Sequence, residues 1–340
     1  MGIAADFRPG RARAFAAGRP ALLALAMLCA VPAAARAAGC ATEAGCIQQL
    51  RFGETQVQRE FAARVLGEMG EAAAVPALAE ALKQDSGDFV RANSARALGQ
   101  IGRRDAVAPL TEALKSDRET PVREAAAWAL GQIAAPQGTA ALAAAVTADA
   151  AFEVRVSAIG ALVAIGGAGG TAAVAGALTG DPRQEVRLKA AQALGHMKGD
   201  GAADALKRAL AGDAEAAVRA QAALSMGDLD DPALGAALTA AVEADKDTGV
   251  RHAAAASLGK RRESGAVPAL IRALQQDGSL DVRQEAAIAL GRIGGPEAKE
   301  ALTYFAEHSI FPDIRRVASE MLEENADRLN AAAPAVRPAR

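Results

Sequence analysis

Aromatic residues are scarce in this chain of 340 residues: they make up 3% of it, with one Trp, one Tyr and eight Phe. Compact domains take much of their buried area from aromatic side chains. Hydrophobic residues still account for 51% of the chain, and most of them are alanine, leucine or valine. Because alanine is the best helix former and a poor strand former, the composition argues against a β-sandwich or barrel and favours helices that pack through small side chains.

An excess of basic charge is also missing. Lys plus Arg number 38 and Asp plus Glu number 40, which gives a net charge of −2, and the isoelectric point is near 6.0. Proteins that neutralise nucleic-acid phosphates carry a basic stripe and a high isoelectric point. We therefore expect no nucleic-acid partner.

No apolar run is long enough to cross a membrane. The uncharged stretch at residues 21–31 is shorter than the roughly 17–25 residues that a spanning helix needs. Four arginines precede it, and the small-residue sequence Ala35-Arg36-Ala37 follows it. A basic region, a short apolar core and such an ending are the three parts of a secretory signal peptide. We predict a signal peptide at residues 1–38 and an exported protein, in the periplasm or cell envelope.

Cysteine is rare as well. One of the three cysteines lies inside the predicted signal peptide, and Cys40 and Cys46 lie in the short segment 39–53 that follows it. In an oxidising compartment these two residues would form a disulfide. A second interpretation stays open, because residues 37–40 (Ala-Ala-Gly-Cys) resemble a bacterial lipobox and Cys40 would then carry a lipid anchor. The usual Leu of that motif is replaced by Ala37.

What the sequence does have is a repeat of 32 residues. Seven residues after each repeated Arg comes Leu or Met, and Gly follows in seven of nine repeats. The Arg column comprises Arg59, Arg91, Arg123, Arg155, Arg187, Arg219, Arg251, Arg283 and Arg315. The Asp column comprises Asp85, Asp117, Asp149, Asp181, Asp213, Asp245 and Asp277. A position that all repeats share belongs to the stack, whereas a binding site is expected where the repeats differ.

Each period contains two helical patterns. Residues 90–101 and residues 106–116 each place apolar or small side chains on one helix face, and Gly102 with the polar residues after it separates them. Neither helix is amphipathic enough to stand alone, so stacking of copies must bury their faces. We predict an all-α fold, a superhelical solenoid of helical hairpins with a 32-residue repeat.

The pattern D-x4-V-R-x2-A-A-x-A-L-G-x-I-G, followed by A-V-x-A-L-x-x-A-L-K-x-D, resembles HEAT repeats of the short phycobilisome-lyase-like type. Residues 85–117 follow it almost letter by letter. The resemblance covers residues 54–326 and implies eight hairpins with a capping helix at 312–326. The hairpins are expected to start near residues 54, 87, 119, 151, 183, 215, 247 and 279. Residues 327–340 are expected to form a disordered tail.

The resemblance also implies roles for the two conserved columns of the repeat. The V-R helices would line the concave surface, and each turn Asp would cap the following helix and bond to neighbouring Arg side chains along the stack. An Asp at a helix start satisfies free N–H groups, and an Arg can bridge adjacent units with two parallel hydrogen bonds. The seven aspartates and the arginines from Arg91 to Arg283 are therefore predicted to form a structural ladder.

No catalytic or metal-binding motif is apparent. His196, His252 and His308 lack the Glu neighbour found in the iron-holding HEAT family that resembles deoxyhypusine hydroxylase, and their 56-residue spacing does not match the repeat. The glycine-rich sequence 167–172 fits a loose dinucleotide fingerprint, but it occupies a turn of the repeat rather than a strand–helix junction. With Val163 replacing the repeat Gly nearby, it predicts a local flexible joint. We expect no enzyme activity, no metal and no cofactor.

The columns that differ between repeats predict the binding surface. Positions five and nine residues after each Arg share one face of the helix, and Trp128, the only Trp, would be the natural hot spot for a partner. The alternative is that Trp128 packs against the next hairpin. The predicted partner-binding residues are Arg96, Trp128, Gln132, Gln192, Lys260 and Arg292.

These observations predict a non-catalytic exported scaffold or adaptor that binds a protein or peptide on the concave face of the solenoid. The alternative function is a cofactor-handling HEAT protein: a lyase-like or hydroxylase-like enzyme, or a chaperone for a tetrapyrrole, as in the bilin lyases for which the repeat is named. A chromophore or metal that copurifies with the protein would favour this alternative.

Overall fold

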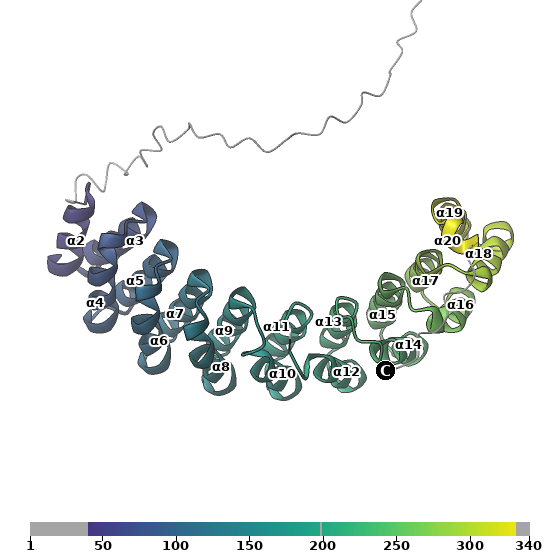
Figure 1. Ribbon diagram of the computed structural model, residues 1–340, viewed down its shortest axis with the longest axis horizontal. Coiled ribbons are helices and arrows are strands. Elements are labelled where there is room, and N and C mark those ends of the chain that lie inside the picture. Colours follow the sequence, from purple (N-terminus) through teal and green to yellow (C-terminus); the bar gives the residue numbers. More distant parts are fainter. Residues whose placement is uncertain (1–39, 198, 331–340) are drawn as a thin grey trace, which may run out of the picture.

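The computed structural model describes residues 40–197 and 199–330. The predicted signal peptide at 1–38 and the tail at 331–340 lie outside these residues. Within the described part of the chain, all regular structure is helical, as the composition predicted. The helices form a curved stack of two rows, and the row on the concave side holds the V-R helices (Figure 1). The fold is thus the predicted all-α solenoid.

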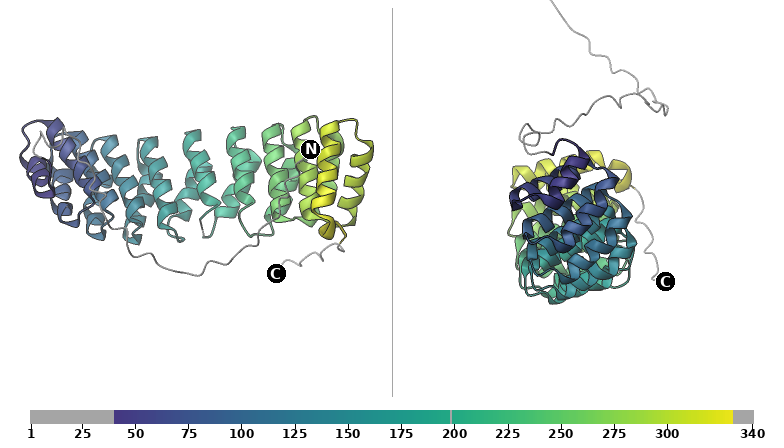
Figure 2. Two further views of the ribbon diagram at one scale, coloured as in Figure 1. Left: turned by 90° about the horizontal axis from the view of Figure 1, so that it is seen from above. Right: turned by 90° about the vertical axis from the view of Figure 1, so that its left-hand side faces the viewer.

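The concave row, here called the inner row, consists of nine helices: α3 (Gln56–Met69), α5 (Asp88–Ile101), α7 (Thr120–Ile133), α9 (Phe152–Ile165), α11 (Gln184–Leu194), α13 (Ala216–Met226), α15 (Thr248–Arg261), α17 (Leu280–Ile293) and α19 (Pro312–Glu324). The outer row on the convex side consists of α2 (Glu43–Phe52), α4 (Val75–Gln84), α6 (Val107–Ser116), α8 (Thr139–Ala148), α10 (Thr171–Gly180), α12 (Ala202–Gly212), α14 (Leu234–Ala244), α16 (Val267–Gln276) and α18 (Pro296–His308). Seen from above, the helices stand side by side along the length of the stack (Figure 2).

The two ends differ from what the repeat predicts. Each of the eight hairpins begins within two residues of its expected position. Helix α2, however, extends the outer row into the segment 39–53, where it packs on α3 and α4. At the other end, residues 326–330 form the short helix α20 and Leu329 is buried. The prediction of a disordered tail from residue 327 is therefore wrong for 327–330, because burying Leu329 against the last hairpin holds this turn in place.

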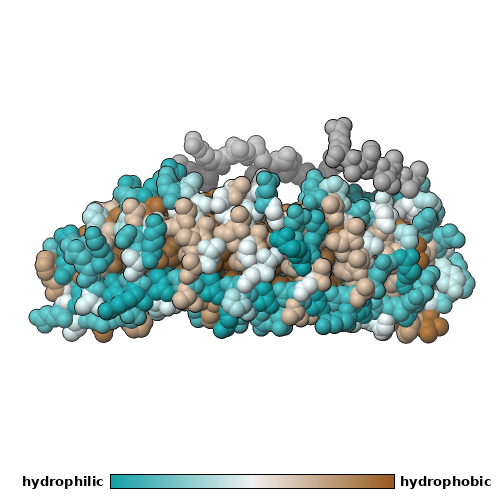
Figure 3. Space-filling view, turned by 90° about the horizontal axis from the view of Figure 1, so that it is seen from below, coloured by the Kyte–Doolittle hydropathy of each residue, from teal (hydrophilic) through white to brown (hydrophobic). Residues whose placement is uncertain are grey.

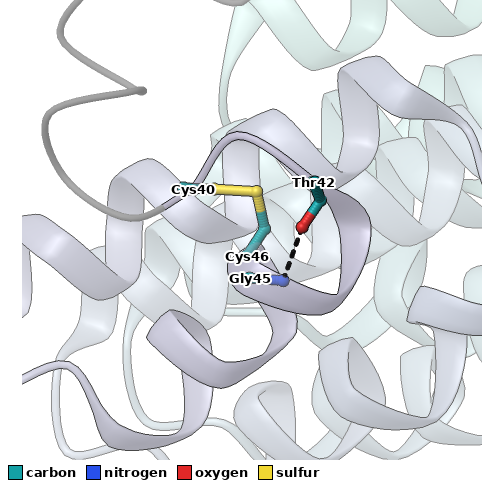
Figure 4. Close-up of a disulfide and its surroundings, with 4 residues drawn as sticks. All are labelled: Cys40, Thr42, Gly45 and Cys46. Atoms are coloured by element: carbon teal, nitrogen blue, oxygen red, sulfur yellow. Dashed lines mark hydrogen bonds between the residues drawn. A yellow bond between two sulfur atoms is a disulfide. The ribbon is translucent and has the colours of Figure 1, made fainter.

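A disulfide bond links the first turn of the N-terminal helix α2 to the segment before it. The sulfurs of Cys40 and Cys46 are bonded, both cysteines are fully buried, and the Thr42 hydroxyl accepts a hydrogen bond from the Gly45 N–H at 3.1 Å (Figure 4). The bridge ties the residue in front of α2 to the first turn of that helix. A Cys40 sulfur that is bonded to Cys46 cannot also carry a lipid, so the two interpretations of Cys40 exclude each other, and the structure has the disulfide.

Close helix–helix approach explains why the chain needs so few aromatics. A Cβ atom on Gly99 of α5 would lie 2.7 Å from the Cα atom of Ala129 in α7, and one on Gly131 would lie 2.8 Å from the Cα atom of Ala161 in α9. Only glycine lets the backbones of neighbouring inner helices come this close. The core is correspondingly a continuous layer of Ala, Leu and Val rather than one central cluster.

The predicted ladder forms along the edge of the stack. Arg91 donates from Nε and Nη2 to the carboxylate of Asp117, at 2.7 and 3.0 Å, and from Nη1 to the carbonyl oxygen of Asp85 at 3.0 Å. Each such Arg therefore ties the turn before its hairpin to the turn after it. The same geometry joins seven pairs: Arg59–Asp85, Arg91–Asp117, Arg123–Asp149, Arg155–Asp181, Arg187–Asp213, Arg219–Asp245 and Arg251–Asp277.

Three details of the ladder correct the prediction. The Asp117 carboxylate accepts a hydrogen bond from the N–H of Glu119, the residue just before α7, at 2.9 Å, so it closes the turn instead of capping the first helical N–H groups. Arg283, predicted to belong to the ladder, has no aspartate partner because Ser309 occupies the corresponding turn position. Arg59 belongs to the ladder in addition to the predicted arginines.

Candidate protein-binding surface

All six predicted partner-binding residues are exposed and lie on inner helices. Arg96 is on α5, Trp128 and Gln132 are on α7, and Gln192 is on α11. Lys260 and Arg292 are on α15 and α17. The outer row covers one side of an inner helix and its neighbours cover two more, so an exposed residue in the middle of such a helix faces the concave side. The concave surface thus brings these residues into one elongated face.

The centre of this face is apolar. Trp128, Leu188 and Leu224 are 39%, 38% and 45% exposed, respectively, and come from α7, α11 and α13. We call these three residues the apolar row. Leu224 occupies the same repeat position as Trp128, which the sequence could have indicated. The exposure of Leu188, one residue after the ladder Arg, had no sequence signal, since that position is buried or partly buried in most other repeats.

Trp128 packs against a neighbouring hairpin, but this is the preceding hairpin and not the next one that the alternative predicted. A Cβ atom placed on Gly99 of α5 would lie 3.0 Å from Cζ3 of the indole, so the ring edge packs against the preceding hairpin. More than a third of the side chain nevertheless stays exposed. The indole is therefore held in place by α5 while one part of it faces the concavity, and such a pre-ordered aromatic residue suits a binding hot spot.

Helix α9 lies between these side chains and adds little charge. Its outward positions are Val156, Gly160 and Ala164, none of them ionisable. Lys189 of α11 is the nearby basic residue, and its Cε lies 3.9 Å from the position that a Cβ of Gly160 would occupy, an ordinary van der Waals distance. The centre of the concave face is therefore mainly apolar, with one basic side chain beside it.

At each end of the concave face, charged side chains form ion pairs with oppositely charged neighbours. Arg64 binds Glu68 at 2.6 Å on α3, and Lys260 on α15 forms an ion pair with Asp228, which follows α13. The Lys260 and Arg292 cations, both predicted to bind a partner, already have acidic neighbours. These exposed pairs keep the ends hydrated and leave the apolar row as the least hydrated part of the face.

Arg292 shares its acidic neighbour with a histidine. The Glu285 carboxylate lies 3.7 Å from Arg292 Nη1 and 3.6 Å from His252 Nε2. Burial raises the pKa of the Glu285 carboxyl above its ordinary value, although His252 and Arg292 counteract part of this effect. Glu285 is the one acidic residue of the inner row whose pKa is shifted upward among the described groups with a resolved shift.

The histidines do not gather into a metal site. In the described part of the chain, no group of three or more His, Cys, Asp or Glu side chains is placed to hold a metal ion. His308 stacks on Tyr304 at 4.8 Å between ring centres, far along the chain from His196 in the turn after α11. Within the glycine-rich sequence 167–172, residues 167–170 lie in the turn between α9 and α10, as predicted, and residues 171–172 begin α10. No helix among the described residues is long and apolar enough to span a membrane.

The family model for HEAT repeats matches residues 44–131, 90–163, 108–182, 171–259 and 235–323, which together cover nearly all of the described chain. The chain belongs to the HEAT-repeat family. The predicted resemblance to HEAT repeats is thereby confirmed, and the ladder and the Gly–Ala contacts are features of its repeat. No sequence among the curated proteins matches the chain.

Solved structures of HEAT-repeat proteins are similar in fold. A structure of importin beta in an ammonium sulfate condition has a TM-score of 0.61 at 15% identity and covers 85% of this chain and 46% of its own length. Yeast importin-beta (Kap95p) has a TM-score of 0.60 at 14% identity and covers 86% and 46%. The chain thus spans about half the length of these importins, and the likeness shows the fold alone.

A third similar structure is the CpcE and CpcF complex of phycocyanin lyase from Nostoc sp. PCC7120. It is 26% identical and covers 83% of this chain and 94% of its own, but its TM-score is 0.35.

Proposed function

We propose that this HEAT-repeat chain is a non-catalytic scaffold that binds a protein or peptide on the centre of its concave face. The apolar row carries the proposal: Trp128, Leu188 and Leu224 are large apolar side chains left exposed on three inner helices of one curved surface. Exposed apolar side chains that share one surface mark interaction sites. Extended concave faces are the surfaces that repeat proteins use for binding.

Site-specific photocrosslinking tests this proposal. A photoreactive amino acid at Leu188 or Leu224 should capture the same partner from intact cells, identified by mass spectrometry. The same amino acid at Thr147, exposed on the outer helix α8, is the matched control and should not capture it. Equal capture from Thr147, or no capture from the concave positions, would contradict the proposal.

A variant that introduces a charge into the apolar row provides the functional half of the test. Replacing Leu224 by Arg puts a cation into the apolar row without touching the core, since the side chain is 45% exposed. We expect capture through Leu188 to fall at least about tenfold, because a desolvated charge in an interface centre costs more than about 1.4 kcal/mol. Circular dichroism should show an unchanged thermal unfolding transition.

The proposal includes export. It is supported by the predicted signal peptide and by the Cys40–Cys46 disulfide, because disulfides persist in oxidising compartments. The intact mass of the mature protein distinguishes the alternatives: cleavage after Ala38 with two hydrogens lost supports export with a disulfide, whereas the added mass of acyl chains identifies a lipid on Cys40. An uncleaved chain in which all three cysteines are free thiols would contradict both.

The alternative function, a cofactor-handling lyase-like or hydroxylase-like protein, is tested by the same purified material. An absorption spectrum and a metal analysis of the protein isolated from its native cells are expected to show neither chromophore nor stoichiometric metal. A bound tetrapyrrole or iron would replace the scaffold proposal with this alternative.

A further inference from the structure

Arg283 occupies the ladder position of the last hairpin without a carboxylate to bind. Each of the other seven ladder arginines binds the aspartate 26 residues later, and the residue 26 positions after Arg283 is Ser309. Arg283 donates instead from Nε to the carbonyl oxygen of Asp277 at 2.6 Å, and its guanidinium carbon lies 5.2 Å from the centre of the Phe311 ring. Among the described residues, no acceptor is hydrogen-bonded to Nη1 or Nη2 of Arg283.

The turn around Ser309 keeps the shape that it has in the other repeats. Ser309 has φ −62° and ψ 135°, close to the −68° and 131° of Asp117. Its hydroxyl accepts a hydrogen bond from the N–H of Phe311 at 3.3 Å, just as the Asp117 carboxylate accepts one from Glu119. Only the carboxylate is missing. The last ladder site therefore has its arginine, Arg283, but no acidic side chain at position 309 to bind it.

This unpaired arginine lines a groove of about 860 Å³ between α16, α18 and the turn into α19. Three of the few aromatic residues of the chain, Tyr304, Phe305 and Phe311, lie in its wall. Tyr304 is 58% exposed and Ile310 is 82% exposed. In a chain with 3% aromatics, this concentration of exposed aromatic and branched apolar surface is a suitable place for a partner's apolar side chain.

The groove carries basic side chains at one end and acidic side chains toward the other. Arg283 and His308 lie at the end where α17 begins and α18 ends, because the two helices run antiparallel. Glu297 and Glu300, in the first turns of α18, line the groove toward its other end. Arg272 also lines it but forms an ion pair with Glu243. A ligand that fits therefore has its acidic group at the Arg283 end and none at the Glu297 end.

We propose that this groove binds a peptide segment of a partner protein that carries an Asp or Glu next to an apolar residue. The carboxylate accepts two hydrogen bonds from Arg283 in the way that each ladder aspartate does, since a planar guanidinium matches a carboxylate with two parallel bonds. The apolar residue packs on Tyr304 and Phe311. This site lies on the outer side of the last repeats, apart from the concave face, so either proposal can fail without the other.

A peptide selection tests the proposal on the full chain. A library of random heptapeptides displayed on phage is selected on the immobilised protein, and the enriched peptide is synthesised with a fluorescent label for anisotropy titration. We expect enriched sequences to contain one Asp or Glu beside an apolar residue. Changing that acid to its amide should weaken binding at least about tenfold, as should Arg283→Gln, because either change removes a charged hydrogen-bonded pair.

Ser309→Asp is the decisive variant, because it supplies the missing carboxylate within the chain. It should pair with Arg283, raise the melting temperature and abolish peptide binding, so loss of binding cannot be ascribed to unfolding. The matched control Ser309→Asn leaves Arg283 without a carboxylate and should keep the affinity, as should Trp128→Ala. Enrichment without acidic residues, no enrichment at all, or full binding by Ser309→Asp would overturn the proposal. Self-association that Ser309→Asp abolishes would identify a second copy as the occupant and would also overturn it.

Discussion

The central repeats, α9 to α14, and the repeats on either side of them share the same ladder but not the same packing. In the flanking repeats from α3 to α7 and from α15 to α17, the inner helices are 14 residues long, and each repeat Gly lies against an Ala of the next helix except Gly291, which lies against Met321 of α19. In the centre, α11 and α13 have 11 residues, Val163 replaces the repeat Gly, and α9, α11 and α13 lie less closely packed (Figure 1 and Figure 2). The predicted joint at repeat four coincides with the first of these wider contacts.

The outer row varies too, but its apolar part does not coincide with the centre, because α8 belongs to the flanking repeat before α9. Helices α8 and α10 contain no Asp, Glu, Lys or Arg, and the convex face is pale brown over them, whereas it is teal over α12 (Figure 3). The ladder pairs Arg155–Asp181, Arg187–Asp213 and Arg219–Asp245 nevertheless run through the centre without a gap. Where apolar contact between inner helices is thinner, the ladder must carry a larger share of the coupling between repeats.

Lowering the pH should have the largest effect on the difference between the central and the flanking repeats. Burial raises the pKa of the Asp213 carboxyl, but the hydrogen bonds from Arg187 and from the Glu215 N–H, with the nearby Arg charges, hold it below the ordinary value of 3.8. Asp117 and Asp245 are shifted the same way. A carboxyl with a lowered folded-state pKa stabilises the protein fully above its unfolded pKa and loses this contribution as the pH falls through the folded pKa. We expect unfolding as the pH falls below about 4.

The order of loss separates the two regions. The fluorescence of Trp128 reports on the flanking helix α7, and far-ultraviolet circular dichroism reports on all helices. Ellipticity should start to fall at a higher pH than the Trp128 signal changes, because the centre depends more on the ladder. If the ellipticity and the Trp128 fluorescence change at the same pH, the central and the flanking repeats depend on the ladder to the same extent.

Deleting one ladder carboxylate in each region gives the next largest effect. Asp213→Ala and Asp117→Ala each leave a largely buried guanidinium without its partner. Each should lower the free energy of unfolding by about 2–4 kcal/mol, somewhat less than the roughly 3–5 kcal/mol for a fully buried pair. In urea, Asp213→Ala should separate the Trp128 transition from the circular dichroism transition, whereas Asp117→Ala should keep them together. Equal behaviour of the two variants would contradict the larger role of the central ladder.

A smaller difference is expected from the contacts between inner helices. Gly131→Ala puts a methyl group 2.8 Å from the Ala161 backbone in the tight contact between α7 and α9, so it should cost about 1–3 kcal/mol of unfolding free energy. Val163→Ala, at the corresponding position of α9, should change stability by less than about 1.5 kcal/mol, because removing two methyl groups from a partly buried side chain leaves little cavity. Thermal melts of the two variants make the comparison; an equally destabilised Val163→Ala would show that α9 and α11 are in tight contact after all.

The smallest effect belongs to the exposed pair between Lys260 and Asp228, which joins the centre to the C-terminal flank. Lys260→Ala should change the unfolding free energy by less than about 1 kcal/mol, because exposed ion pairs are hydrated and screened. The difference should vanish at about 1 M salt, where the Debye length is roughly 3 Å. A larger, salt-independent loss would show that Lys260 has a role in packing.

Much of the fold followed from the 32-residue period. Val90, Leu98 and Ile101 fixed one helix face, and the Asp column located each turn. The period could not indicate α2 or α20, because a terminal helix lacks a neighbour on one side and so departs from the repeat. It also did not show that Ser309 leaves Arg283 unpaired, although the missing Asp was visible in the sequence.

The candidate binding surface was only partly predictable. The variable columns correctly singled out exposed inner-helix residues such as Trp128 and Gln192. The exposure of Leu188 depends on the distance between α11 and its neighbouring helices. The sequence of a single repeat does not determine this distance. The ion pair of Lys260 with Asp228 likewise joins two repeats, so neither residue alone indicated it.

The sequence by itself determined the period, the two rows of helices and the residues of the ladder, because each follows from local helix geometry repeated every 32 residues. Tertiary structure alone decided which of these copies pack tightly and which apolar side chains stay exposed. Those properties depend on small displacements between neighbouring repeats, where a single methyl group or carboxylate changes the contact.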